Sequence, residues 1–304
     1  MPDVTFSGMA LDRAPELRGD PAQLARLVGD RSSVALAASA EGVLLEQGGA
    51  ELARSPLSTP GSSAPGTTDA ILLGLEDGRA LFAVDLEPLD LHVRSRLLEG
   101  RRIASLRDAG AILSHSDAAL AAYVVALLNW HRRHPRCSVC GATTQVAEGG
   151  YSRRCPACGA THFPRTDPAV IVVVHSGDRV LLGRRANWPE GQYSVLAGFV
   201  SPGESAEEAV KREVLEESGV TVRRPVFVTS QPWPFPTSLM LGFEAIADGG
   251  EPGARDDELE DVGWFTKAEV RAALAGEGDR LRLPPSVSIA RFLIERWCRG
   301  SVDI

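Results

Sequence analysis

Apolar residues group into short runs along this chain, and the runs are densest in its second half. An unbroken apolar run at residues 169–174 predicts a buried strand, and a turn at 176–178 leads into a second strand. Further strands are expected at 193–197, at the neighbouring segments VFVTS and SLMLGFEAIA, and at DVGWF. Helices are expected at 267–275 and 287–299, where apolar residues recur at helical spacing.

The first half of the chain has similar but shorter apolar runs. SSVALAAS and GVLLEQ predict two strands, and AILLGLEDGRALFAVDL predicts a hairpin that turns at Asp77 and Gly78. The stretch 55–70 is rich in Ser, Pro, Gly and Thr, which predicts an exposed loop or flexible insertion inside the first domain. A long helix is expected over 117–134 with Ser116 as its N-cap. Strands mixed with a few helices predict an α+β fold or an α/β sandwich.

One helix of the second half has an unusual charge pattern. Residues 198–203 hold two glycines and a proline, which predicts a loop, and a helix is expected after it. Ser205 and Glu208 form a capping box at its start, and Gly219 is its natural end. Its buried stripe is expected to consist of small and branched apolar residues four apart: Ala206, Val210 and Val214.

A second face of this helix carries three carboxylates, Glu213, Glu216 and Glu217, at spacings of three and four residues. Like charges at this spacing repel one another unless a cation lies among them. Carboxylate oxygens suit magnesium or manganese, especially where substrate phosphates complete the coordination shell. Arg212 is expected to pair with Glu204 and to hold the loop on the helix. The simpler alternative is a solvated acidic helix face.

Composition limits the range of functions. A length of 304 residues suggests about two domains, and the net charge of -8 argues against coating nucleic acid or binding an anionic membrane. No apolar run approaches the length of a membrane span, and the N-terminus lacks the features of a signal peptide, so a cytoplasmic location is expected. No GxxxxGK[ST] phosphate loop is present.

Four of the five cysteines fall into two CxxC pairs, each followed by glycine: Cys137, Cys140, Cys155 and Cys158. This grouping predicts a zinc ribbon, in which four thiolates leave no open coordination position and the zinc is structural. His131 and His134 are possible ligands, but a role at the helix C-terminus or on the surface fits them better. Zinc ribbons can also bind nucleic acid or mediate contacts. Cys298 stands alone.

The acidic helix and its loop carry a pattern that resembles the Nudix box of diphosphate hydrolases. The matching positions are Gly198, Glu204, Arg212, Glu213, Val214, Glu216, Glu217, Gly219 and Val220. Downstream, residues 230–238 read SQPWPFPTS, and three prolines with two aromatics predict a stiff loop, neither helix nor central strand. This segment resembles the array that marks the NADH pyrophosphatase family of Nudix enzymes.

The resemblance extends to the order of domains. It implies an N-terminal domain of the NADH pyrophosphatase type at 1–132, a zinc ribbon at 133–165 and a Nudix domain at 166–304, folded as an α/β/α sandwich with a mixed sheet. It implies a homodimer that hydrolyses NADH or NAD to nicotinamide mononucleotide and AMP with magnesium or manganese. Some members of the family also remove NAD caps from RNA.

The resemblance also implies roles for particular residues. Metal ligands are expected at Glu213, Glu216, Glu217 and Glu258, with Asp256, Asp257, Glu260 and Asp261 as alternatives to Glu258. Glu217 is the candidate base, and Arg212 and Glu204 orient the junction of loop and helix. Phe163 and Phe199 match aromatic positions around a base of the substrate. The other substrate-binding candidates lie in the proline-aromatic segment: Ser230, Gln231, Trp233, Phe235 and Ser238.

Two alternatives compete with this interpretation. The first is a Nudix hydrolase for another nucleoside diphosphate such as ADP-ribose. The second is a zinc-ribbon RNA-binding or regulatory protein whose Nudix domain only senses a ligand. The complete carboxylate set argues against the second alternative, and the proline-aromatic segment argues against the first.

Overall fold

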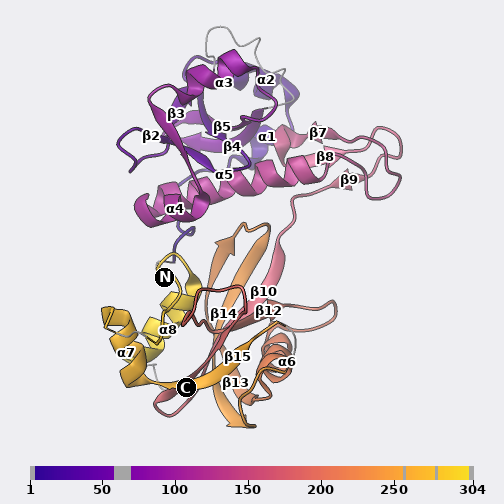
Figure 1. Cartoon of the computed structure of the whole chain (residues 1–304). Coiled ribbons are helices and arrows are strands. Elements are labelled where there is room, and N and C mark those ends of the chain that lie inside the picture. The colour runs from indigo at the N-terminus through magenta and orange to yellow at the C-terminus, as the bar shows by residue number, and fades with distance from the viewer. Residues whose placement is uncertain (1–3, 58–69, 256–257, 278–279, 301–304) are drawn as a thin grey trace. The chain divides into compact units, whose positions relative to one another are not determined.

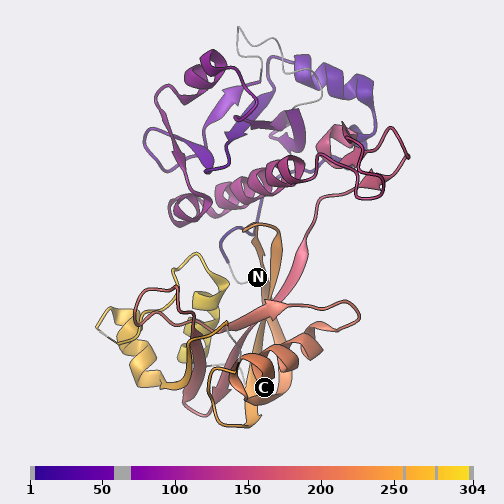
Figure 2. The same cartoon turned by 45° about the vertical axis from the view of Figure 1, so that its right-hand side comes forward.

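The structure is a computed structural model that describes residues 4–57, 70–255, 258–277 and 280–300. Its chain divides into two compact units, shown in Figures 1 and 2. The C-terminal unit comprises Met1–Thr5, Asp167–Trp233 and Ser238–Ile304, and the N-terminal unit comprises Phe6–Thr166 and Pro234–Thr237. No helix in the described part of the chain is both long and apolar enough to cross a membrane.

The C-terminal unit is built on a six-stranded mixed sheet with the order β13-β14-β10-β11-β15, and β12 pairs with β10. Only the β10–β14 pair is parallel among its named strand pairs. The strands are β10 (Asp167–Ser176), β11 (Arg179–Arg184), β12 (Leu196–Phe199), β13 (Thr221–Trp233), β14 (Ser238–Gly249) and β15 (Asp261–Thr266). The helices are α6 (Ala206–Ser218), α7 (Lys267–Ala275) and α8 (Ile289–Arg299).

Helices cover both faces of this sheet, because β10 is apolar at every position of its centre. Val170 and Val172 pack with Val210 and Val214 of α6 in one core cluster. The alternate residues of β10 belong to a second cluster with α7 and α8, which includes Leu293. Figure 1 shows α6 on one side of the sheet and α7 with α8 on the other. The predicted α/β/α sandwich is therefore confirmed.

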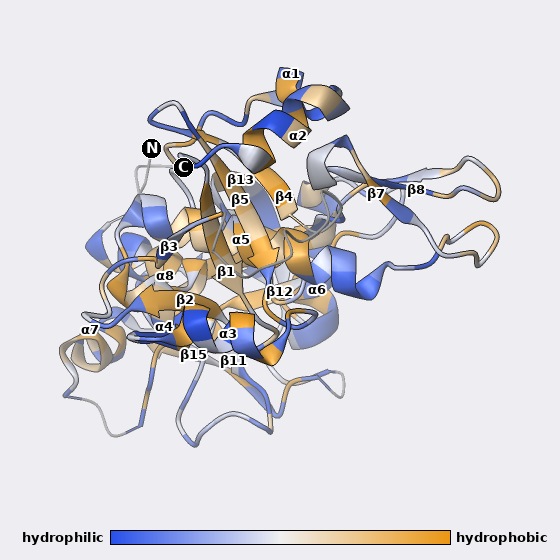
Figure 3. Ribbon diagram, turned by 90° about the horizontal axis from the view of Figure 1, so that it is seen from above, coloured by the Kyte–Doolittle hydropathy of each residue, from blue (hydrophilic) through white to orange (hydrophobic). Residues whose placement is uncertain are grey.

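The N-terminal unit contains a second six-stranded sheet and most of the remaining helices. Its strands are β1 (Val34–Ala38), β2 (Val43–Glu46), β3 (Arg54–Pro56), β4 (Ala70–Glu76), β5 (Arg79–Asp85) and β6 (Arg101–Ala104). Its helices are α1 (Pro15–Arg18), α2 (Pro21–Gly29), α3 (Leu91–Leu98), α4 (Leu106–Ile112) and α5 (His115–Arg133). Helix α5 contacts β1 and β5, and the interior of β4 is apolar (Figure 3).

The two large sheets share one topology. The order in the N-terminal sheet is β4-β5-β1-β2-β6, with β3 paired to β1 and a parallel β1–β5 pair. Each strand therefore has a counterpart at the same place in the other sheet. Helix α6 follows β12, whereas the corresponding segment after β3 includes residues 58–69, which contain a single acidic residue. The N-terminal unit thus repeats the sheet of the C-terminal unit without its acidic helix sequence.

A small sheet carries the cysteine pairs. It consists of β7 (Gln145–Ala147), β8 (Ser152–Arg154) and β9 (Thr161–His162), with the 3-10 turn η1 (Glu148–Gly150) between the first two. The two CxxC segments lie in the loops before β7 and between β8 and β9. In Figure 1 these loops extend beyond the strands that carry them.

Several predicted elements differ in detail. Ser114 caps α5 by accepting a hydrogen bond from the backbone N–H of Asp117, so the helix begins before the predicted cap at Ser116. The strand expected at 193–197 is β12, displaced toward the glycine loop. Of the expected loop at 55–70, Ser55 and Pro56 lie in β3, and 58–69 lie outside the described residues.

The proline-aromatic segment is also more regular than predicted. Residues 230–233 end β13 and Ser238 begins β14, so only Pro234–Thr237 forms a turn. Proline is tolerated at position 232 because β13 is the edge strand of the sheet. It has no neighbouring strand on its outer side that would need a hydrogen bond from the missing N–H.

Candidate active site and metal centre

The junction between β12 and α6 has the capping geometry that its sequence predicts. The Ser205 side chain accepts from the backbone N–H of Glu208, and the Glu208 carboxylate accepts from that of Ser205, which confirms the capping box. Gly219 ends the helix with φ 73°, a left-handed conformation that favours glycine. Of the predicted stripe, Val210 and Val214 are buried, while Ala206 is half-buried.

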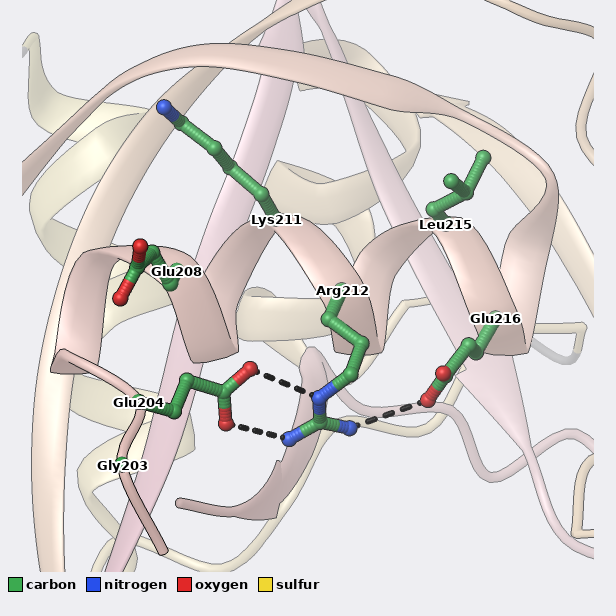
Figure 4. Close-up of a pocket in the computed structure, with 7 residues that line it drawn as sticks. All are labelled: Gly203, Glu204, Glu208, Lys211, Arg212, Leu215 and Glu216. Atoms are coloured by element: carbon green, nitrogen blue, oxygen red, sulfur yellow. Dashed lines mark hydrogen bonds and ion pairs between the residues drawn. The ribbon is translucent and has the colours of Figure 1, made fainter. Parts of the chain in front are cut away.

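Arg212 joins the loop to the helix through four groups at once. Its guanidinium donates to both carboxylate oxygens of Glu204 at 2.8 Å and to the Phe199 carbonyl at 2.9 Å. It also pairs with Glu213 at 2.9 Å and with Glu216 at 3.0 Å. Figure 4 shows the fork toward Glu204 and the contact with Glu216. The predicted Arg212–Glu204 pair is confirmed, and it lowers the pKa of Glu204 to about 2.

The three helix carboxylates differ in their environments. Glu217 is 3% exposed, although its spacing predicted a face away from the core, whereas the Glu216 side chain is 54% exposed. Burial raises the pKa of Glu213; Arg212 opposes this shift, and the charges of Glu216 and Glu258 add to it. A carboxylate whose pKa is raised by burial and by neighbouring negative charge gains most from a cation.

Oxygen donors of this kind fit a divalent cation of the magnesium type. A glycine leaves room for one of them, because a Cβ on Gly198 would lie 1.9 Å from the carboxylate carbon of Glu213. The donor atoms are not gathered as closely as in a ligand cluster. Among the described residues, the group of three or more potential ligands with donor atoms all within 4.8 Å is the four cysteines. In this structure Arg212 lies between Glu213 and Glu216 instead.

The fourth acidic position lies near the same helix. Glu258 contributes to the raised pKa of Glu213, and its carboxylate accepts from Arg185 at 2.8 Å. Two of the alternatives have other partners: Glu260 pairs with Arg184, and Asp261 accepts from the Tyr193 hydroxyl at 2.5 Å. Asp256 and Asp257 lie outside the described residues. Arg185 was not predicted, since nothing near it in the sequence marks it as a partner of Glu258.

A surface hollow of about 580 Å³ borders the Arg212 network (Figure 4). Its lining combines a cation pair, an apolar side chain and acidic groups: Gly203, Glu204, Glu208, Lys211, Arg212, Leu215 and Glu216. Leu215, in the last turn of α6, is 48% exposed there. The hollow thus offers both charged and apolar contacts next to Glu216.

The four cysteines have the geometry of a tetrahedral thiolate site. The sulfurs of Cys137 and Cys158 are 3.6 Å apart, and those of Cys140 and Cys155 are 3.5 Å apart. Tetrahedral zinc with Zn–S bonds of 2.3 Å requires sulfurs about 3.8 Å apart, so the arrangement fits zinc. A residue missed in the sequence is His162, whose Nε2 lies 3.2 Å from Sγ of Cys137.

Neither histidine at the end of α5 belongs to this cysteine group. Nε2 of His131 lies 2.8 Å from the Gly150 carbonyl, and Nδ1 of His134 lies 3.0 Å from the Trp130 carbonyl. Burial lowers the pKa of His131 to about 4, so its ring is neutral at pH 7 and brings no charge to the helix terminus. The lone Cys298 lies on α8 and is buried in the core.

Gln231 is the most constrained residue of the proline-aromatic segment. It is fully buried, its side-chain amide donates to the carbonyls of Thr5 and Val287, and its oxygen accepts from the Ile289 N–H at 2.8 Å. All three partners belong to the C-terminal unit. The amide therefore joins β13 to the start of α8.

The aromatic candidates fall into different settings. Phe163 and Phe199 are 64% and 59% exposed, which leaves their rings accessible to a ligand. Phe235 belongs to the N-terminal unit, where its ring lies 6.2 Å from that of Phe6 and under the Arg107 guanidinium. Trp233 is half-buried at the end of β13. Ser230 and Ser238 are half-buried on β13 and β14, and Ser238 pairs with Trp233.

These features place the chain in the class of Nudix hydrolases. A glycine loop and a capped acidic helix are joined by Arg212, on a mixed sheet that lies between helical layers. Family comparisons agree with this class. Residues 165–284 match the NUDIX domain, residues 132–163 match the NADH pyrophosphatase zinc ribbon domain, and residues 32–130 match the NADH pyrophosphatase-like rudimentary NUDIX domain. The last match explains why the two large sheets share one topology.

The relatives narrow the class to one family. The chain is 45% identical over 242 residues to the NAD-capped RNA hydrolase NudC of Mycobacterium bovis, covering 75% of each chain. It is 42% identical over 198 residues to the human NAD-capped RNA hydrolase NUDT12, covering 62% of this chain and 43% of the relative. A NUDIX hydrolase structure from Nitrosomonas europaea aligns with TM-score 0.44 and 19% identity over 55% of this chain and 91% of its own. The chain belongs to the NudC-like NADH pyrophosphatase family.

Proposed function

We propose that the protein hydrolyses the diphosphate of NADH or NAD to nicotinamide mononucleotide and AMP, and that it removes NAD caps from RNA. The observation that carries this proposal is the 45% identity over 75% of both chains to a NAD-capped RNA hydrolase. The intact carboxylate set Glu213, Glu216 and Glu217 supports an active enzyme rather than a ligand sensor.

The proposed metal ligands are Glu213, Glu216, Glu217 and Glu258. A magnesium or manganese ion held by these residues would supply positive charge to the diphosphate oxygens and would lower the pKa of the attacking water. We assign Glu217 as the base that accepts the proton of that water. Its side chain is buried on the same helix as Glu213 and Glu216. The water oxygen forms a bond to one phosphorus, and the bridging P–O bond breaks. Arg212 and Glu204 hold the loop in place.

Substrate recognition is assigned to the exposed aromatic rings and to the proline-aromatic segment. Phe163 and Phe199 offer accessible faces on which a base can stack. Ser230, Trp233, Phe235 and Ser238 complete the proposed set. Gln231, which is bonded to three backbone groups, acts by holding β13 against α8 and so by positioning its neighbours.

The organisation of the molecule is proposed on the same basis. We place domain boundaries at 1–132, 133–165 and 166–304, which the three matched family regions support. We also propose a homodimer, as the family resemblance implies. A cytoplasmic location suits the four thiolates, because a reducing compartment keeps such cysteines available to zinc.

The test compares kcat/KM for NADH, NAD-capped RNA and ADP-ribose with the zinc-loaded full chain in magnesium or manganese. The proposal expects both NAD-containing substrates to be hydrolysed with a higher kcat/KM than ADP-ribose. A clear preference for ADP-ribose would replace the proposed substrate class while leaving the Nudix chemistry in place.

A further inference from the structure

The two cysteine loops repeat one sequence pattern. Residues 136–144 read RCSVCGATT and residues 154–162 read RCPACGATH. Their backbone hydrogen bonds match as well. The N–H of each first cysteine donates to the carbonyl of the alanine five residues later at 2.8 Å, and each glycine N–H donates to the carbonyl of that first cysteine at 2.9 Å. Arg136 and Arg154 therefore occupy equivalent positions, each immediately before the first cysteine of its loop.

This ribbon is basic within an acidic chain. Residues 133–165 contain five arginines and one glutamate, whereas the whole chain has a net charge of -8. Four thiolates with one zinc ion add two negative charges, so the ribbon keeps a net positive charge. One of these arginines has a structural role, because Arg153 is buried and its guanidinium donates to the hydroxyl and the carbonyl of Thr144. A local excess of arginine in an acidic protein is a signature of an anionic partner.

Arg136 and Arg154 face solvent. Both are exposed, and within the described parts of the chain no carboxylate forms an ion pair with either of them. The sulfur of Cys137, the residue after Arg136, is contacted by other groups. It lies 3.4 Å from the Val139 nitrogen and 3.2 Å from Nε2 of His162. The Arg136 guanidinium donates to the Gly141 carbonyl at 3.4 Å. Its remaining N–H groups and the Arg154 guanidinium are available to a ligand.

Arg154 is also the centre of a row of polar side chains across the small sheet. Gln145 on β7 and Thr161 on β9 pair with Arg154 of β8, and all three residues are exposed. Residues paired in register on adjacent strands lie on the same face of a sheet. This row offers an amide, a guanidinium and a hydroxyl with no carboxylate among them.

We propose that the exposed face of the zinc ribbon binds the phosphate backbone of single-stranded RNA through Arg136 and Arg154. Guanidinium groups bind phosphate oxygens in a bidentate manner, and Gln145 and Thr161 can donate to neighbouring phosphate or ribose oxygens. This inference rests on the proposed function, since a capped substrate brings such an RNA chain with it. The ribbon then selects capped RNA over free dinucleotide without touching the bond that is broken.

The test uses Arg136→Gln combined with Arg154→Gln, and Arg31→Gln as the matched control, an exposed arginine of the same unit outside the ribbon. Michaelis constants are measured for NADH and for a 20-nucleotide single-stranded RNA with a 5′ NAD. The double variant should raise KM for the capped RNA about tenfold, with NADH kinetics and zinc content unchanged. Two lost phosphate contacts should reduce the slope of log KM against log salt by about 1.4.

Fluorescence anisotropy of the same RNA without NAD tests the surface apart from turnover. Weaker and less salt-dependent RNA binding by the double variant supports the proposed RNA-binding surface. This holds even if the wild-type protein cleaves no NADH, a result that would reject only the proposed function. Equal binding by wild type and double variant overturns the inference. Loss of zinc, or an equal loss of activity on NADH and capped RNA, also overturns it, because the arginines would then support the fold.

Discussion

At the scale of single residues, the position of Glu213 depends on a missing side chain. A methyl group on Gly198 would lie 1.9 Å from the carboxylate carbon of Glu213, so the carboxylate would have to move. We expect Gly198→Ala to weaken manganese binding and to lower kcat/KM about 10- to 100-fold, which calorimetry and steady-state kinetics measure.

The matched control is Gly253→Ala, since an added Cβ there meets no atom within 4 Å. Unchanged kinetics in Gly198→Ala would show that the close approach of loop and carboxylate has no catalytic consequence.

A second prediction at this scale concerns pH. The pKa of Glu204 is lowered from 4.5 to about 2, first by its hydrogen bonds with Arg212 and then by the Ser201 N–H. A carboxyl group whose pKa is lower in the folded than in the unfolded protein stabilises the fold at pH values above the unfolded-state pKa. This stability is lost as the pH falls toward 2. The melting temperature of Glu204→Gln should therefore lie below that of the wild type at pH 7, and the gap should narrow between pH 4.5 and 2.

Calorimetric melting curves of the two proteins across this range provide the measurement. A gap independent of pH would mean that the carboxylate charge does not hold the loop on the helix.

At the scale of elements, the zinc ribbon supplies the next prediction. Its small sheet of three short strands buries little apolar surface, so the metal contributes directly to folding. Cys137→Ser should release zinc and lower the melting temperature by about 5 to 10 °C. Cys298→Ala is the control for zinc content, because Cys298 lies outside the ribbon. Full zinc retention in Cys137→Ser would contradict the four-thiolate site.

Local signals predicted the elements best. The capping box of α6 and its glycine end depend on neighbouring residues alone, so Ser205, Glu208 and Gly219 could be assigned from sequence. The extension of β13 through Pro232 could not, because it depends on this strand being an edge of the sheet. The bonds of Gln231 to Thr5 and Val287 join segments far apart in sequence, and no pattern near Gln231 announces them.

At the scale of the whole molecule, the two units share a sheet topology but differ in the acidic helix proposed to carry catalysis. Both units have a six-stranded sheet with the same order and one parallel pair, yet the acidic helix is found after β12. Strand order is set by long-range pairing, which is why the sequence suggested two domains without showing that their sheets correspond. This difference supports the proposal that the metal-dependent chemistry belongs to the C-terminal unit.

The central claim is that Glu217 and its neighbours make this protein a hydrolase of the NAD diphosphate. The most direct test is chromatographic analysis of products after incubation of the zinc-loaded protein with NADH and manganese. Glu217→Gln is the test variant, and Glu207→Gln, an exposed glutamate of the same helix, is the control. The account predicts reduced nicotinamide mononucleotide and AMP with the wild type and the control, and a loss of about 10²- to 10⁴-fold in kcat with Glu217→Gln. Intact NADH with a folded wild-type protein, or full turnover by Glu217→Gln, would contradict it.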